Sequence, residues 1–182
     1  GSLEGGSGSI TREQYNFPPT LYGNGRVNPT QNLVDAFPMS NGYPITDENS
    51  GYDPENPYEN RDKRLGEYIL YNGGTIAGTT IMTETGSGDD ALNAIKTSTR
   101  TGYYLKKLLR GDVNLDPSSI QYKQHYPVHL RYTEIFLIYA EAANEAWGPE
   151  GTGNFTFSAR NIMEQLRNRV GIRTSTDTYL AS

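Results

Sequence analysis

The sequence predicts a mainly α-helical fold with long irregular loops and one small β-hairpin. Two segments near the C-terminal end carry apolar residues at three- and four-residue spacing, which is typical of helices that bury one face. The 182 residues include 20 glycines and 10 prolines, and this content favours turns and loops over most of the remaining chain. Two β-rich segments, 67–71 and 79–83, flank Asn72-Gly73-Gly74 and predict the hairpin, with a wide loop.

The N-terminal part of the chain is predicted to be irregular. Residues 1–10 are nearly all small and polar, so we expect a flexible tag or loop there. Residues 11–25 carry Pro18-Pro19 and Gly23-Asn24-Gly25, which interrupt regular structure. We therefore expect an irregular segment that displays aromatic rings.

A short helix is predicted over residues 28–38, followed by a long loop over 39–64. Asn28 suits the N-cap, Pro29 the first helical position and Gln31 the return bond of a capping box. Leu33, Val34 and Phe37 would form its apolar side. Residues 103–108 are expected to form a third strand or an extended segment.

The strongest pattern predicts two helices, over residues 131–147 and 158–170. We expect them to pack antiparallel through Ile135, Tyr139, Ile162 and Leu166, because these positions share one face of each helix. Ser158 is the expected N-cap of the second helix. The pair is compatible with one tetratricopeptide-like repeat, which cannot bury its apolar face alone.

Composition excludes several classes of function. The net charge of −5 disfavours nucleic acid as a partner, and the absence of cysteine excludes thiolate metal sites and cysteine nucleophiles. We expect no cofactor and no metal centre. The acidic segment 47–62 lacks an EF-hand pattern, so a solvated loop is favoured there over bound Ca²⁺.

Five blocks, in this order, resemble the SusD/RagB family of outer-membrane nutrient-binding lipoproteins of Bacteroides-type bacteria. They are NPTQNLVDAF, SGYDPENPYENRDKRL, TGYYLKKLL, HLRYTEIFLIYAEAANEA and ARNIMEQLRNRVGI. The resemblance implies that residues 11–182 are part of a SusD/RagB-type domain, loop-rich over 11–128 and with the helical pair over 129–173. It also implies a fragment of a larger α-helical fold, taken from its central to C-terminal section, with the lipid-anchored cysteine outside this chain.

By this resemblance, the protein is expected to be a surface glycan-binding protein of the outer membrane, and not an enzyme. It would take part in polysaccharide utilisation by delivering oligosaccharides to a SusC-like TonB-dependent transporter. A peptide-binding RagB-like role remains an alternative, and a glycan hydrolase is a less favoured one.

Aromatic rings on loops are the best candidates for ligand contact, because sugars lay their C–H faces on such rings. The leading candidates are Tyr15 and Tyr22, with Asn24 and Arg26 as polar partners. Phe17, Tyr43, Tyr52 and Tyr58 are further rings on the same kind of segment. Their other possible role is to pack the loops onto the helical body.

Overall fold

The structure, a computed structural model, describes residues 10–126 and 128–172. The described chain forms two compact units, one of residues 10–35 with 64–126 and one of residues 36–63 with 128–172. Regular structure is mostly helical with a few short strands, which confirms the mainly α class. Of the segment 1–10, predicted to be flexible, only Ile10 lies within the described residues. None of the described helices is long and apolar enough to cross a membrane.

The first unit begins with a helix that the sequence did not predict. α1 (Thr11–Asn16) is followed by the short 3₁₀ helix η1 (Pro19–Leu21), so an irregular segment over all of 11–25 was wrong. The sequence of α1 has no apolar periodicity. Its support comes from distant contacts of the buried Glu13 and from the Asn16 side chain, which donates to the Arg12 carbonyl at 2.9 Å.

The helix predicted over 28–38 is shorter than expected. α2 (Gln31–Asp35) begins after Thr30, whose carbonyl accepts the Leu33 N–H at 3.1 Å. Asn28 is not the cap: its side chain donates to the Gly25 carbonyl and accepts from the Arg100 N–H. Leu33 is half exposed and does not belong to the apolar side, whereas Val34 is buried.

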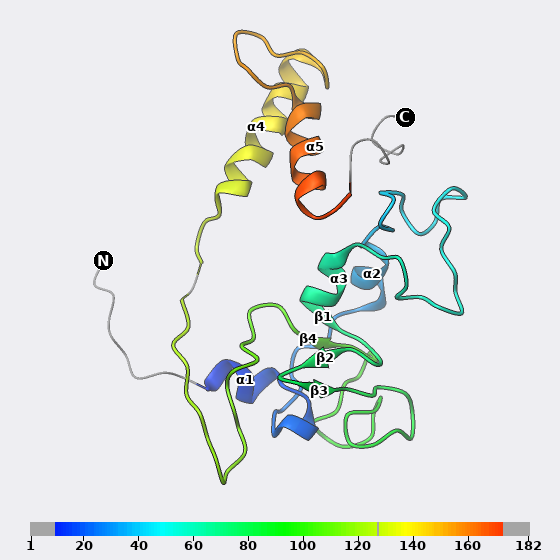
Figure 1. Cartoon of the computed structure of the whole chain (residues 1–182), viewed down its shortest axis with the longest axis vertical. Coiled ribbons are helices and arrows are strands. Elements are labelled where there is room, and N and C mark those ends of the chain that lie inside the picture. The colour runs from blue at the N-terminus through cyan, green and yellow to red at the C-terminus, as the bar shows by residue number, and fades with distance from the viewer. Residues whose placement is uncertain (1–9, 127, 173–182) are drawn as a thin grey trace. The chain divides into compact units, whose positions relative to one another are not determined.

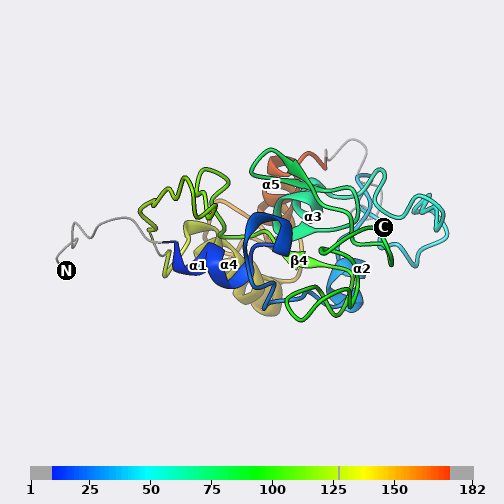
Figure 2. The same ribbon diagram turned by 90° about the horizontal axis from the view of Figure 1, so that it is seen from below.

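The strands pair differently from the prediction. Residues 67–68 belong to α3 (Lys63–Tyr68), and β1 (Ile69–Leu70) pairs antiparallel with β4 (Tyr104–Leu105). The hairpin exists, but its first strand is β2 (Thr75–Ile76), inside the region expected to be the wide loop, and its second is β3 (Thr79–Thr80), at the start of the predicted strand 79–83. The strand predicted within 103–108 is confirmed for β4 (Tyr104–Leu105), whereas residues 107–108 form a turn. Between β3 and β4 the chain forms turns and bends, drawn as an irregular green tube in Figure 1 and Figure 2.

The core of the first unit surrounds Tyr104, which is fully buried with Phe17 and Leu70. The Tyr104 hydroxyl accepts the Thr99 N–H and donates to the Asp90 carbonyl, each at 2.9 Å. Burial is the main reason that the pKa of Tyr104 is raised to about 12. The neutral hydroxyl therefore ties the irregular segment before β4 to the core.

The two predicted helices of the second unit are confirmed. α4 (Tyr132–Trp147) and α5 (Ala159–Arg169) run side by side in opposite directions (Figure 1). Ser158 caps α5 by accepting the Asn161 N–H at 3.2 Å, and the Asn161 side chain accepts the Ser158 N–H in return. The tetratricopeptide-like character of the pair stays a prediction.

One of the four residues expected between α4 and α5 is misplaced. Ile135 is 46% exposed, whereas Ile162 is 2% exposed and Tyr139 and Leu166 pack around it. Small side chains, Ala140 and Ala143 among them, fill the contact in place of Ile135. α4 is apolar on more than one side, so spacing alone did not identify the buried face.

Candidate functional site

The first candidate residue, Tyr15, lies on α1, and the chain that carries the other three folds back on this helix. The N–H groups of Asn24 and Arg26 donate to the carbonyls of Gln14 and Tyr15, both at 2.9 Å. Glycine is required at this return, because a Cβ on Gly23 would collide with the backbone of Phe17. The glycines of this turn therefore serve close backbone packing.

The fold-back brings Tyr15 and Arg26 together. The Arg26 guanidinium carbon lies 4.4 Å from the centroid of the Tyr15 ring, in a cation–π contact. Tyr15 is 43% exposed, and Arg26 is exposed as well. The pair presents a flat apolar ring next to five N–H donors, a combination that can hold a polar ligand with an apolar face. The third candidate of this group, Asn24, is half-buried.

Tyr22 lies in a different setting from the other three candidates. It follows η1 with φ of +60°, a left-handed conformation that is uncommon for tyrosine, and its side chain is 57% exposed. It lines a groove of about 400 Å³, here called the Tyr22 groove. The other lining residues are Phe17, Leu21, Ala77, Gly111, Asp112, Val113, Asn114, Leu115, Asp116 and Gln121. Tyr15, Asn24 and Arg26 do not line it. Phe17, another ring considered from the sequence, is a core residue.

Most of the groove is formed by residues 111–121, which form a short antiparallel turn. Asn114 and Gln121 exchange backbone hydrogen bonds at 3.3 and 2.9 Å. Within the turn, Asp116 accepts from the N–H and the hydroxyl of Ser118 at 2.8 and 2.7 Å. These bonds lower the pKa of Asp116, which is therefore ionised at neutral pH.

An ion pair lies at the start of this turn. The Arg110 guanidinium donates twice to the Asp112 carboxylate, at 2.9 and 2.7 Å. Because of the Arg110 bonds, the pKa of Asp112 is lowered to about 2. The charge of Asp112 is thus balanced by Arg110, and Lys123, whose Nζ lies 3.8 Å from the same carboxylate, adds a positive charge that offsets the negative charge of Asp116 near the groove.

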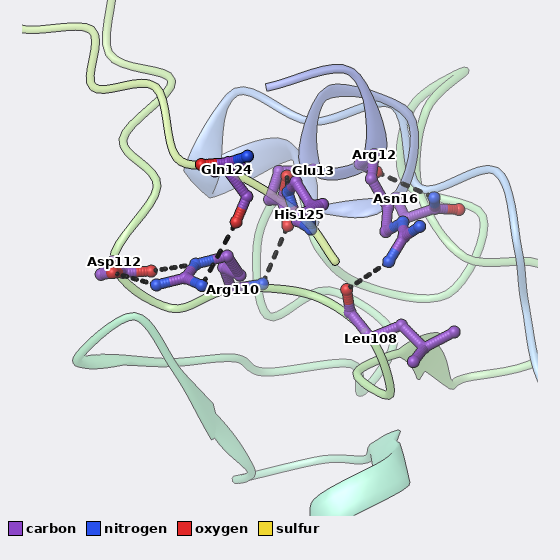
Figure 3. A network of polar contacts seen from close by, with 8 residues as sticks. All are labelled: Arg12, Glu13, Asn16, Leu108, Arg110, Asp112, Gln124 and His125. Carbon is purple, nitrogen blue, oxygen red and sulfur yellow. Dashed lines mark hydrogen bonds and ion pairs between the residues drawn. The ribbon is translucent and has the colours of Figure 1, made fainter. Parts of the chain in front are cut away.

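A buried carboxylate holds both ends of the turn against α1 (Figure 3). Glu13 is fully buried, and its carboxylate accepts the Arg110 N–H at 2.8 Å. Its second oxygen lies 3.0 Å from Nε2 of His125. Arg12 adds a bond to the Leu108 carbonyl at 3.2 Å, and Arg110 reaches the Gln124 carbonyl at 3.4 Å. The two residues that flank the groove turn, 110 and 125, are therefore joined through one side chain.

Sequence reasoning did not find this network. Glu13 and His125 are 112 positions apart, and neither lies in a motif. A glutamate in a short polar segment carries no signal that it will be buried.

The acidic segment 47–62 uses its carboxylates to close turns. Asp47 accepts from the N–H of Asn49 at 2.8 Å, and Asp53 accepts from the N–H of Glu55 at 2.9 Å. The Asn56 side chain also donates to Asp53, and its bond is the main cause of the lowered pKa of Asp53. Across residues 10–126 and 128–172, no three histidine or acidic side chains are grouped so that they could hold a metal ion.

Comparison with protein families shows to which family the chain belongs. Residues 4–182 match the sequence profile of the SusD family. The chain belongs to the SusD family. A search of curated protein sequences gave no match.

Two solved structures share the fold of this SusD family chain. A SusD-like carbohydrate binding protein from Bacteroides fragilis is 23% identical with a TM-score of 0.65, and the alignment covers 92% of this chain and 34% of that one. A SusD-like protein from the same species is 25% identical with a TM-score of 0.57, covering 93% of this chain and 34% of that one. The chain therefore spans about a third of the length of these structures.

Proposed function

We propose that the protein binds oligosaccharides at the cell surface without changing them and passes them to a SusC-like TonB-dependent transporter. One observation carries the proposal: exposed Tyr15 lies on α1 and exposed Tyr22 on the segment that returns to α1 through backbone bonds, in a fold shared with a solved carbohydrate binding protein. The family match supports the further proposal that the protein lies at the outer membrane and is held there by a lipid anchor.

The tyrosine surfaces suit sugars for physical reasons. A pyranose ring has an apolar face of C–H groups and a rim of hydroxyls, so an aromatic ring next to hydrogen-bonding groups complements both. Tyr15 carries Arg26 over one face of its ring, which leaves the opposite face and the guanidinium donors for a ligand. Because Tyr15 lies on α1 and the Arg26 N–H donates to the Tyr15 carbonyl at 2.9 Å, little ordering of this pair is needed on binding.

The acidic groups near the groove support a binding role over a hydrolytic one. A glycosidase needs a carboxylic acid whose pKa is raised so that it can donate a proton at neutral pH. The pKa values of Asp112 and Asp116 are instead lowered by hydrogen bonds from Arg110 and Ser118. Both groups are suited to accept hydrogen bonds from sugar hydroxyls.

The test is a glycan-array screen of the intact protein, followed by calorimetric titration with the best neutral oligosaccharide. We expect binding without release of reducing sugar over a day, and no uptake of the same glycan by cells that lack the protein. A peptide library and fluorogenic glycosides are the comparison arms. Binding of peptides in place of glycans, or steady hydrolysis, would contradict the proposal.

A further inference from the structure

We propose that the Tyr22 groove is a subsite for one neutral hexose residue of the oligosaccharide, held by Tyr22, Asp116 and Gln121. This inference rests on the proposed glycan-binding function. The sequence gives no sign that these residues share a site, because Tyr22 is far from Asp116 and Gln121 in the chain. The fold places all three in the lining of one groove.

The size and lining of the groove suit a sugar ring. Its volume of about 400 Å³ lies within the range of about 300–1,000 Å³ common for small-molecule sites. Phe17, Val113 and Leu115 are buried residues of the core, so the base of the groove is apolar and is packed against the rest of that core. Tyr22 is held at one side in its left-handed conformation, with more than half of its side chain open to solvent.

The polar groups differ in what they can still bind. The Asn114 side chain is occupied: its amide group donates to Ser119 twice, and its carbonyl accepts the Asp116 N–H at 3.0 Å. In contrast, the Gln121 carboxamide makes no hydrogen bond to another residue of the described chain, and it is exposed. Asp116 uses one carboxylate oxygen for Ser118 and keeps the other. An amide and a carboxylate together supply the donors and acceptors that sugar hydroxyls require.

The charge of the groove selects a neutral ligand. Asp112 is paired with Arg110 at 2.7 Å and with Lys123 at 3.8 Å, and the Asp116 carboxylate accepts from the neutral groups of Ser118. The charges of these two cations and two carboxylates sum to about zero, so the groove offers no excess positive charge to uronic acids or sulfated sugars. A carboxylate still accepts strong hydrogen bonds from neutral hydroxyls.

The groove is held in place before a ligand arrives. Glu13 joins Arg110 and His125 at the two ends of the turn that carries Asp116 and Gln121 (Figure 3). Because Glu13 is fully buried and its two contacts are partly buried, the turn has little freedom to lose when a sugar binds. The same contacts allow exposed lining residues to be changed without altering the turn.

The test is calorimetric titration of the intact protein with maltohexaose, cellohexaose, mannohexaose and laminarihexaose, and with hexagalacturonate as the anionic probe. We expect the preferred neutral hexasaccharide to bind at least about tenfold more tightly than hexagalacturonate. Tyr22→Ala, Asp116→Asn and Gln121→Ala should each weaken it about fivefold or more, and Tyr22→Phe should retain most of the affinity. Tyr122→Ala is the matched control, because Tyr122 is also 57% exposed and adjoins Gln121 but does not line the groove.

Hydrogen exchange with and without saturating sugar gives a second measurement that does not depend on the variants. We expect slower exchange in residues 111–121 when the neutral sugar is bound. If wild type binds a neutral sugar while the three groove variants match Tyr122→Ala and exchange over 111–121 is unchanged, the subsite is refuted and the proposed function stands. If wild type binds none of the neutral sugars, both are refuted.

Discussion

Replacing Glu13 by alanine should be among the most damaging single changes in the first unit. The substitution removes two acceptors at once, from the Arg110 N–H at 2.8 Å and from His125 at 3.0 Å. A buried donor left without a partner costs about 1–3 kcal/mol, and the substitution takes the acceptor from both the Arg110 N–H and the His125 ring. The His125 side chain is 13% exposed, so water can reach it and reduce the second cost. We therefore expect a loss of about 2–4 kcal/mol in the free energy of unfolding.

Glu13→Gln should cost less than Glu13→Ala. A carboxamide has one oxygen to accept the Arg110 N–H and one amide group that can donate to a ring nitrogen of His125. We expect a loss of about 1 kcal/mol. Glu67→Ala is the control, since Glu67 is an exposed glutamate on a helix of the same unit, and a change within about 0.5 kcal/mol is expected.

Urea unfolding followed by circular dichroism measures these differences, provided the transition midpoint moves while its slope stays constant. A double-mutant cycle with His125→Ala isolates the contact between Glu13 and His125. The loss of stability in the double variant should be about 1 kcal/mol smaller than the sum of the losses in the two single variants. A Glu13→Ala protein within about 0.5 kcal/mol of wild type, or strict additivity with His125→Ala, would refute the assignment of Glu13 as the support of the groove turn.

Three further changes test other parts of the account. Ile162→Ala, at a position 2% exposed, should cost about 2–5 kcal/mol in urea unfolding, whereas Ile135→Ala, 46% exposed, should cost under about 1 kcal/mol; the reverse order would show that α4 buries its other face. Asp112 has its pKa lowered to about 2 by Arg110, so its stabilisation is complete above about pH 4 and is lost as pH falls toward 2; Asp112→Asn should remove that part of the acid dependence of the unfolding midpoint, and an unchanged profile would contradict the pairing. Gly23→Ala should cost about 1–3 kcal/mol because its Cβ meets the Phe17 backbone, while Gly66→Ala in α3 should be neutral or stabilising by up to about 1 kcal/mol; equal thermal midpoints would dispute the close packing at Gly23.

The C-terminal helices could be predicted because their signals are local. Apolar spacing marks both helices, and Ser158 with Asn161 marks the start of α5 within three residues. The buried face of α4 could not be assigned, because Ile135, Leu137 and Ile138 are apolar and yet substantially exposed. Spacing identifies a helix, but packing decides which side is covered.

The elements of the first unit depend on contacts between distant positions. β1 pairs with β4 rather than with the nearer segment 79–83, and a hairpin rule based on neighbouring segments cannot predict that choice. α1 is polar and short, and its buried Glu13 is bonded to residues 110 and 125. The sequence grouped Tyr15 with Arg26 as candidate ligand contacts, and the structure places the two in contact. It gave no sign that Tyr22 and Gln121 line the same groove.

The central claim is that tyrosines of the segment 15–26 hold a neutral oligosaccharide, and one titration tests it most directly. Wild type and the Tyr15→Ala/Tyr22→Ala protein would be titrated with the preferred neutral glycan at about 0.05 and 0.5 M salt. The account predicts that the double variant keeps its fold and binds more than about tenfold more weakly, a loss of about 1.4 kcal/mol, with little effect of salt on either protein. Equal affinity of the two proteins, or a steep fall of wild-type affinity with salt, would contradict it.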